Sequence, residues 1–266
     1  MVGPTRLPQA GPVDSTGTAE STGTAGTGTS SSSAGAGPLL LLGGAEMQPG
    51  GRDTDLAFLS SVGDGPLVVL LGAATPGSDH ERSSRRARRY HEELGTGREV
   101  VVAPHPQDDL DGCVRAVAGA AAVVVPGGSP VRLLDGLRLD GGRLGRTLVE
   151  GHRAGTALSG SSAGAMVLCA RAAQPDRGRG DGLVVEDGLG LVPGLAVVHD
   201  DGSGAGRWQD PADPDGVRWG LPEQGGVLVH GGTVRAVGSR PVRLWLRGSA
   251  RPVSPDPVPL STLLAG

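Results

Sequence analysis

TALSGSSAGAM, residues 156–166, places a G-x-S-x-G pattern between an apolar run and a run of helix-forming residues. A strand, a tight turn and a helix in this order form a nucleophile elbow, in which the central serine stands on a strained turn. Gly160 and Gly164 permit close packing of the turn, and the N–H groups at the helix start point toward charge that develops on a substrate. Because 48 of the 266 residues are glycine, the pattern alone is weak evidence, and its setting between strand and helix supports the prediction. The stretch therefore predicts Ser162 as a nucleophile on an α/β scaffold.

Short apolar runs alternate with helical patterns in the part of the chain that leads to this turn. Such alternation is typical of a parallel sheet with helices on both faces. We expect strands at 39–42, 67–71, 99–102, 121–125 and 156–159, and helices at 53–62, 79–94, 110–119, 131–136, 144–153 and 163–172. The predicted fold is α/β, a three-layer sandwich with a mainly parallel central sheet and a strand–turn–helix nucleophile elbow.

The pattern changes after residue 182, where short apolar runs follow one another without helices between them. We expect strands at 183–185, 195–198, 225–229, 233–237 and 242–246. Between two of these runs stand His230, Gly231 and Gly232, and glycine accepts the positive φ that a tight hairpin turn requires. This segment therefore predicts a hairpin.

Residues 1–37 differ in composition from the rest of the chain. They are mainly Ser, Thr, Gly, Ala and Pro, with almost no large apolar side chain. Ordering such a segment costs conformational entropy that burial does not offset. We expect a disordered low-complexity tail over 1–37 and one hydrolase domain over 38–266.

Charge and cysteine content narrow the range of environments and partners. The net charge is -4 and every basic residue is arginine, so the chain offers no basic field for nucleic acid. Cys113 and Cys169 both fall in expected helices, where they suit buried apolar positions better than a disulfide framework, which fits a reducing cytoplasm. No signal-peptide pattern opens the chain, and the apolar run at 39–42 is too short to span a bilayer. We expect a cytoplasmic protein with neither membrane nor nucleic-acid partners.

The residues that directly follow the strands are the first candidates for a site, because ligands bind at the carboxyl ends of strands in such sheets. Segments 43–46, 72–75, 104–105, 126–129 and 160–162 follow the first five expected strands, and three of these five segments are rich in glycine. Glycine there lets backbone approach a ligand closely, although a plain tight turn has the same composition.

A serine nucleophile needs a base to accept its proton, so we compared the six histidines. His199 follows the apolar run 195–198 and precedes a polar loop, which places it at the carboxyl end of a strand. His230 also ends a strand, but it stands in the expected hairpin. The other four suit solvated helix positions (His80 and His91), a Pro-His-Pro loop (His105) and a helix end (His152). Glu223, directly before the run 225–229, is the candidate for an orienting acid.

Five motifs in a fixed order resemble peptidase family S51, the serine peptidases that include dipeptidase E and cyanophycinase, within the class I glutamine amidotransferase-like folds. These motifs are LLGGAE at 41–46, VPGG at 125–128, GSSAGA at 160–165, the segment from GLGL at 188–191 to His199, and GLPE at 220–223. Together they cover most of the chain after residue 37 and are more specific than any one motif.

The resemblance implies a role for each of five residues. Ser162 is the implied nucleophile, His199 the general base and Glu223 the acid that orients the base. The backbone N–H groups of Gly128 and Ala163 form the implied oxyanion hole. The implied reaction is hydrolysis of a small aspartyl or isoaspartyl peptide without metal or cofactor, and the resemblance is compatible with a homodimer.

Two positions differ from cyanophycinase-like members of the family, which have Asp-Gln after the paired glycines and Gln-His-Phe around the base. This chain has SP at 129–130 and VHD at 198–200. The differences leave the choice among aspartyl, isoaspartyl and β-aspartyl-arginine peptides open. Asp200, Asp201 and Arg207 are candidates to bind the amine, arginine or carboxylate of a substrate, although exposed loop charges often bind nothing.

Two other functions remain open on sequence grounds. An esterase of the α/β-hydrolase type would use Ser162, Asp213 and His230, which follow the chain order of that fold. The glycine-rich turn at Gly128 argues against an esterase. The oxyanion-hole donor would come from this turn, just before the nucleophile unit, whereas an esterase has that donor in an early loop. A non-catalytic amidotransferase-like binding domain would keep the fold without activity, but the presence of all three candidate side chains favours an enzyme.

Overall fold

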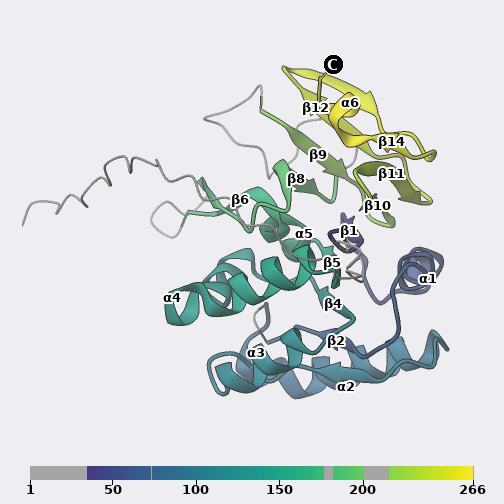
Figure 1. Ribbon diagram of the computed structural model, residues 1–266. Helices are drawn as coiled ribbons and strands as arrows, with labels where there is room; N and C mark the ends of the chain where they lie inside the picture. The colour runs from purple at the N-terminus through teal and green to yellow at the C-terminus, as the bar shows by residue number, and fades with distance from the viewer. Residues whose placement is uncertain (1–34, 73, 177–181, 201–215, 266) are drawn as a thin grey trace, which may run out of the picture. The chain divides into compact units, whose positions relative to one another are not determined.

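The computed structural model describes residues 35–72, 74–176, 182–200 and 216–265 (Figure 1). The described strands form two sheets, one of eight strands and one of six. Residues 1–34 of the expected tail lie outside the described residues. Gly37 already belongs to the folded part, because its N–H donates a hydrogen bond to His152 O at 2.8 Å.

The larger sheet has a parallel centre and an antiparallel edge. In spatial order its strands are β14 (Val258–Pro259), β11 (Thr233–Gly238), β10 (Gly225–His230), β1 (Leu39–Leu42), β5 (Ala157–Ser161), β4 (Ala122–Val125), β2 (Leu67–Val69) and β3 (Val100–Val102). From β1 to β3 every neighbouring pair is parallel, and from β1 to β14 every pair is antiparallel. The parallel half therefore brings the carboxyl ends of β1, β5 and β4 to one edge.

Alternate residues of the central strands face two separate hydrophobic layers. In β1, Leu39 and Leu41 belong to the layer on one face, and Leu40 and Leu42 belong to the layer on the other. The first layer contains residues of α3 (Leu110–Ala118), α4 (Pro130–Arg153) and α5 (Ala163–Leu168), and the second contains residues of α1 (Arg52–Leu59), which follows the short helix η1 (Pro49–Gly51). Helix α2 (Gly77–Glu93) contacts the edge strand β3. Helices on both faces of a mostly parallel sheet give the α/β sandwich that the sequence predicts.

Helix α4 is interrupted in its middle. Leu139 leaves the helical conformation, and Asp140, Gly141 and Gly142 have φ of 48°, 63° and 86°. Two helical halves result, in agreement with the separate helices expected at 131–136 and 144–153.

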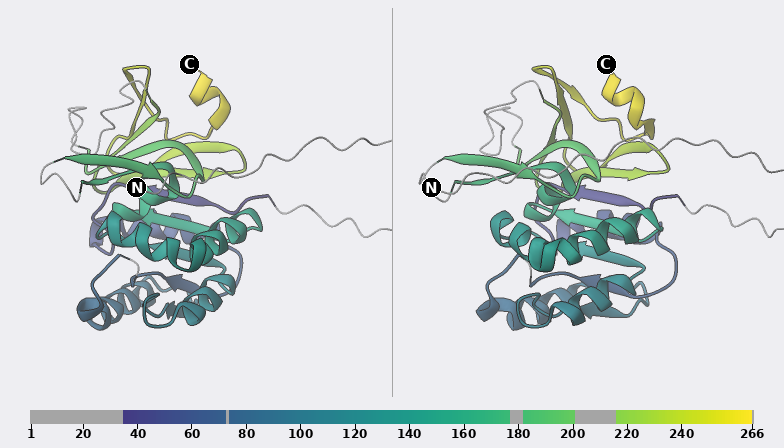
Figure 2. Two further views of the ribbon diagram at one scale, coloured as in Figure 1. Left: turned by 90° about the vertical axis from the view of Figure 1, so that its left-hand side faces the viewer. Right: turned by 60° about the vertical axis from the view of Figure 1, so that its left-hand side comes forward.

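The second sheet contains most of the strands that follow α5. In spatial order it consists of β13 (Ser249–Pro252), β12 (Arg243–Leu246), β9 (Arg218–Leu221), β8 (Val192–Val198), β6 (Cys169–Pro175) and β7 (Leu183–Asp187). In both views of Figure 2 these green to yellow-green strands lie above the purple strand β1. The helix expected at 163–172 is shorter in the structure, because α5 ends at Leu168 and Cys169 begins the strand β6. A short helix, α6 (Leu260–Ala265), follows β14.

The expected hairpin is confirmed. Strands β10 and β11 pair antiparallel with His230 opposite Thr233, and Gly231 and Gly232 have φ of 57° and 76°.

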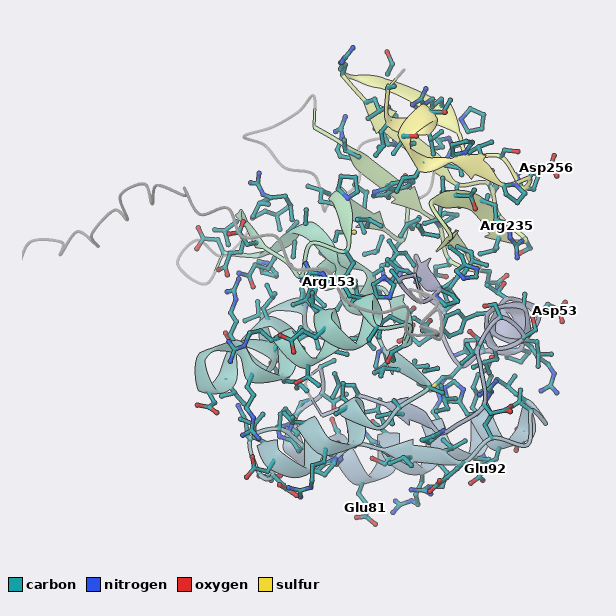
Figure 3. The ribbon with its side chains drawn as sticks, in the orientation of Figure 1. Asp53, Glu81, Glu92, Arg153, Arg235 and Asp256 are labelled. Carbon is teal, nitrogen blue, oxygen red and sulfur yellow. The ribbon has the colours of Figure 1, made fainter. Side chains whose placement is uncertain are left out.

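Charged side chains such as Asp53, Glu81 and Glu92 extend outward from the helices (Figure 3). Among the described helices, none is long and apolar enough to cross a membrane.

Candidate active site

Ser162 occupies the turn between β5 and α5. Its φ of 49° and ψ of -115° lie outside the regions that a residue with a side chain normally adopts. The Ser162 N–H donates to Leu42 O at 2.9 Å, which ties the turn to the end of β1. The expected strand, tight turn and helix are therefore present, with backbone strain at the serine itself.

Both glycines of the G-x-S-x-G pattern are required by close packing. A Cβ on Gly164 would lie 1.9 Å from Val125 O, and a Cβ on Gly160 would lie 2.7 Å from the backbone of Gly164. The start of α5 thus packs directly against the ends of β4 and β5, and any side chain at these two positions would displace the turn.

The structure brings Ser162, His199 and Glu223 together in one hydrogen-bonded row. Ser162 Oγ lies 3.0 Å from His199 Nε2, and His199 Nδ1 lies 3.1 Å from Glu223 Oε1. The side chains of His199 and Glu223 are 44% and 62% exposed, so the row opens to solvent. Hydroxyl, imidazole and carboxylate in this order can pass a proton from the serine to the histidine while the carboxylate holds the ring.

His199 reaches Ser162 from the second sheet. It directly follows β8 and has a φ of 54°. Its N–H donates a hydrogen bond to Gly43 O at 3.0 Å. Glu223 comes from the connection between β9 and β10, which passes so close to Gly43 that a Cβ on Gly43 would lie 2.3 Å from Pro222 O. The backbone after β1 is therefore the junction at which His199 and Glu223 meet Ser162.

Two backbone N–H groups near the elbow have no hydrogen-bond acceptor in the described structure. Ala163 is the first residue of α5, so its N–H has no acceptor within the helix. Gly128 follows β4 in a turn with a φ of 146°, and no residue in the described ranges accepts its N–H. The neighbouring Gly127 lies against the elbow, since a Cβ on it would be 3.1 Å from Ser162 Cβ.

Glu46 also belongs to this site, although the sequence interpretation assigned it no role. Its Oε1 accepts the Gly127 N–H at 2.9 Å, and its Oε2 accepts the Ser161 hydroxyl at 2.8 Å. The one available signal was its position, an acidic residue two places after Gly44 in the segment that follows a strand.

The loop residues expected to bind substrate are only partly described. Asp201 and Arg207 lie outside the described residues, as does Asp213 of the alternative esterase triad. Asp200 is described and is only 4% exposed, and its carboxylate lies 3.8 Å from Arg243 of β12. This position corrects the expectation of an exposed loop charge, because the Asp200 side chain packs within the second sheet.

The other histidines lie away from the serine row. His230 ends β10 in the exposed hairpin. His91 is buried, with 4% exposure, so the expectation of a solvated helix position was wrong, and burial lowers its pKa to about 4. In the part of the chain that the structure describes, no group of three or more His, Cys, Asp or Glu side chains is arranged to hold a metal ion.

Comparisons with known proteins give one family, from a family model, and one fold, from solved structures. The model of peptidase family S51 matches residues 39–209, which include Ser162 and His199 and end before Glu223. The crystal structure of a peptidase from an acI-B1 Actinobacterium matches with a TM-score of 0.67 and 20% identity, over 86% of this chain and 98% of that chain. A putative peptidase E protein from Listeria monocytogenes EGD-e matches with a TM-score of 0.57 and 16% identity, over 77% of this chain and 100% of that chain. No curated protein matches the sequence.

Proposed function

The chain belongs to peptidase family S51, and from this premise we propose that it is a serine peptidase in which Ser162 is the nucleophile, His199 the general base and Glu223 the orienting acid. The row of contacts from Ser162 Oγ to Glu223 Oε1 is the observation that supports this proposal. The fold resembles a glutamine amidotransferase-like scaffold, and it matches both peptidase structures.

The reaction would begin with attack of Ser162 Oγ on the carbonyl carbon of the scissile amide. At 3.0 Å, His199 Nε2 is placed to accept the hydroxyl proton as the new C–O bond forms, and it then donates this proton to the leaving amine. A water molecule that loses its proton to His199 would attack the acyl-enzyme, and the Ser162 oxygen would recover a proton as the acid product leaves. Glu223 fixes the ring orientation by accepting a hydrogen bond from the Nδ1–H group throughout, without taking up its proton.

The negative charge of the tetrahedral intermediate needs donors that are already in place. The N–H groups of Gly128 and Ala163 fit this need. Ala163 directly follows Ser162, Gly128 follows Gly127, which lies against the elbow, and neither N–H has an intramolecular acceptor in the described structure. Loss of one such donor typically costs about 10²–10³ in kcat in enzymes of this kind.

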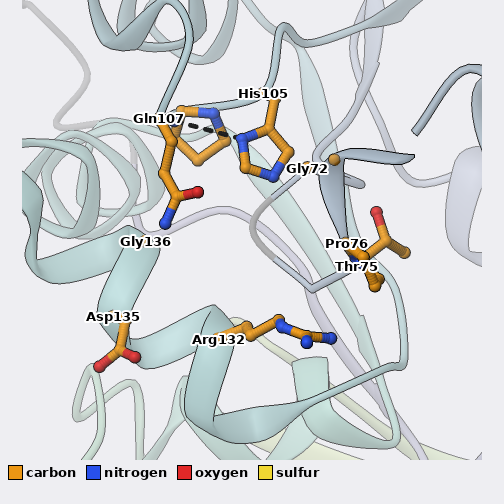
Figure 4. Close-up of a pocket in the computed structure, with 10 residues that line it drawn as sticks. Gly72, Thr75, Pro76, His105, Gln107, Arg132, Asp135 and Gly136 are labelled. Atoms are coloured by element: carbon orange, nitrogen blue, oxygen red, sulfur yellow. Dashed lines mark hydrogen bonds between the residues drawn. The ribbon is translucent and has the colours of Figure 1, made fainter. Parts of the chain in front are cut away.

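Two pockets that share Thr75 each contain an arginine that can bind a substrate carboxylate. Figure 4 shows a pocket of about 280 Å³ in which the Arg132 guanidinium extends toward Pro76 and Thr75, while the Asp135 carboxylate points the other way. A second pocket of about 250 Å³ shares Thr75, reaches Gly127 and contains Arg86. Each pocket also contains one acidic residue, Asp135 in the first and Glu46 in the second. The arginine of either pocket can bind the carboxylate of the small aspartyl or isoaspartyl peptides that we propose as substrates.

Covalent labelling by a fluorophosphonate tests the proposed nucleophile. The reagent forms a bond from Ser Oγ to phosphorus and releases fluoride, so the labelled residue can be read by peptide mass mapping. We expect label on Ser162 of the wild type, none on Ser162→Ala, and normal labelling of Ser60→Ala, an exposed serine after α1. An unlabelled, fully folded wild type would favour the non-catalytic binding domain instead.

The substrate is tested separately, by hydrolysis of Asp-X, isoaspartyl and β-aspartyl-arginine peptides. A homodimer and a cytoplasmic location stay predictions from the sequence, and sedimentation and cell fractionation test them.

A further inference from the structure

We propose that Glu46 is a positioning residue that fixes the Gly127–Gly128 turn in the orientation an oxyanion hole requires, an inference that rests on the function proposed above. Glu46 does not itself touch the reacting atoms in this assignment. It acts through the backbone of the turn.

The two hydrogen bonds of Glu46 join three neighbouring strand ends. Glu46 follows β1, Gly127 follows β4, and Ser161 is the last residue of β5, which lies between these two strands. Its Oε1 accepts from the Gly127 N–H at 2.9 Å and its Oε2 from the Ser161 hydroxyl at 2.8 Å. Ser161 is only 3% exposed, so one side of this bridge is buried. A single carboxylate thus connects the turn of the proposed hole to the strand that presents Ser162.

The Gly127 N–H bond holds the peptide group that precedes the one carrying the Gly128 N–H. Paired glycines have the widest choice of backbone conformation, so without an external partner the turn can rotate a carbonyl toward the site in place of an N–H. With Gly127 N–H held by Glu46, the following N–H, that of Gly128, has no acceptor in the described structure and stays available. On the other side of the turn, Ala74 leaves no space for a side chain at position 128, because its carbonyl oxygen would lie 2.5 Å from a Gly128 Cβ.

The fit around Gly127 shows how closely Glu46 and the elbow enclose the turn. A Cβ on Gly127 would lie 2.6 Å from Glu46 Oε1 and 3.1 Å from Ser162 Cβ. The turn therefore passes between the carboxylate and the proposed nucleophile with no space for a side chain, so a displaced Glu46 would change the position of the Gly128 N–H relative to Ser162.

The loop that presents Glu46 is itself strained. Gly44, Ala45 and Met47 have φ of 142°, 58° and 55°. Alanine and methionine rarely adopt positive φ, and such conformations persist where the surrounding structure over-determines them. The positive φ values of Ala45 and Met47, on either side of Glu46, fit a loop whose conformation is set by the contacts of the Glu46 carboxylate with Gly127 and Ser161.

Hydrogen bonding, and not charge, is the expected mode of action. A negative charge beside an oxyanion hole would repel the oxyanion, so Glu46 can favour the reaction only through the geometry it imposes. Glutamine has the same shape, and its amide can accept from Gly127 N–H and donate to the Ser161 hydroxyl. Glu46→Gln should therefore rescue what Glu46→Ala loses.

The test measures the saturation kinetics of fluorophosphonate labelling, which separate reagent affinity from the rate of phosphonylation. For Glu46→Ala we expect the limiting rate to fall about 10- to 100-fold, since small misplacements of catalytic groups cost on this scale, with half-saturation unchanged within about threefold. Glu46→Gln should stay within about fivefold of the wild type, and Glu92→Ala, an exposed glutamate of α2, should match it. If Glu46→Ala does not fold, Glu46→Asp takes its place, because the shorter side chain cannot make both bonds.

Two results would overturn the inference. One is a folded Glu46→Ala protein that is labelled at the wild-type rate. The other is an equal loss in Glu46→Ala and Glu46→Gln, which would assign the effect to charge. Failure of the proposed function has a different signature, because Ser162 of the wild type would then not be labelled at all.

Discussion

The imidazole of His199 lies directly on the backbone of Gly44, so closely that a Cβ on Gly44 would stand 2.4 Å from His199 Cε1 and 2.8 Å from Nδ1. Gly44 therefore forms one wall of the space in which the ring is held between Ser162 and Glu223. The absence of a side chain at position 44 is thus part of the placement of the proposed base.

Replacement of Gly44 by alanine should displace the ring and reduce turnover sharply. The methyl group cannot occupy the ring position, and a φ of 142° adds backbone strain for any residue other than glycine. We expect kcat/KM to fall by about 10² or more while the protein remains folded. Gly63→Ala is the matched control, because a Cβ at position 63 meets no atom within 4 Å and should leave kcat/KM unchanged. Equal activity of the two variants would contradict the proposed role of His199.

The choice of base is tested by comparing His199→Ala with His230→Ala on one hydrolysed peptide. His199 Nε2 is 3.0 Å from Ser162 Oγ, whereas His230 ends β10 in an exposed hairpin. Base catalysis typically contributes about 10²–10⁴-fold, so His199→Ala should lose that much kcat/KM and His230→Ala almost none. The reverse result would favour the esterase-type triad.

Thiol reagents should leave the enzyme active. Cys113 and Cys169 are both fully buried, and burial raises the pKa of each thiol to about 12. The thiolate is the reactive form, so neither cysteine should react while the protein is folded. We expect full activity after iodoacetamide treatment and alkylation of both residues only in denaturant. Rapid inactivation of the folded protein would instead indicate a cysteine near the site.

Asp55 should make stability depend on pH. Burial raises the pKa of its carboxyl from 3.8 to about 6, and the Tyr90 hydroxyl donates to it at 2.6 Å. Because the folded pKa is above the unfolded value, proton binding favours the folded state below pH 3.8, and this contribution is lost as pH rises through about 6.

Asp55→Asn, which keeps an acceptor for Tyr90, should therefore raise Tm relative to the wild type at pH 8, with a smaller advantage at pH 5. Asp53→Asn, an exposed residue in the same helical turn, controls for the helix dipole. A Tm difference that does not vary between these pH values would show that the Asp55 carboxyl titrates normally.

Most of the parallel half of the fold follows from local pattern. β1 has the expected limits of 39–42, and the helix interruption near residue 140 follows from its glycines. The second sheet did not follow in the same way. Residues 163–172 are helix formers, yet from Cys169 the chain pairs with β7 and β8, so tertiary pairing overrides local propensity. β9 was missed because its four residues include arginine and glycine among the apolar ones.

The positions of the candidate site residues were partly predictable for the same reason. Ser162 and His199 each follow an apolar run at a strand end, a relation that sequence alone can show. The role of Glu46 depends on contacts across 81 and 115 residues of chain, with Gly127 and Ser161. Burial of Asp200 likewise depends on Arg243 and the packing of a sheet that the sequence pattern did not reveal.

Because the proposed nucleophile ends a strand of one sheet and the proposed base ends a strand of the other, synthesis of the chain imposes an order on the appearance of activity. Ser162 leaves the ribosome first, His199 second and Glu223 third. The connection that holds Glu223 is fixed only when β10 pairs with β1, a strand that is synthesised before Ser162. A nascent chain therefore exposes Ser162 before the proposed base and acid stand beside it, so we expect hydrolytic activity to appear only after β10 has joined the sheet.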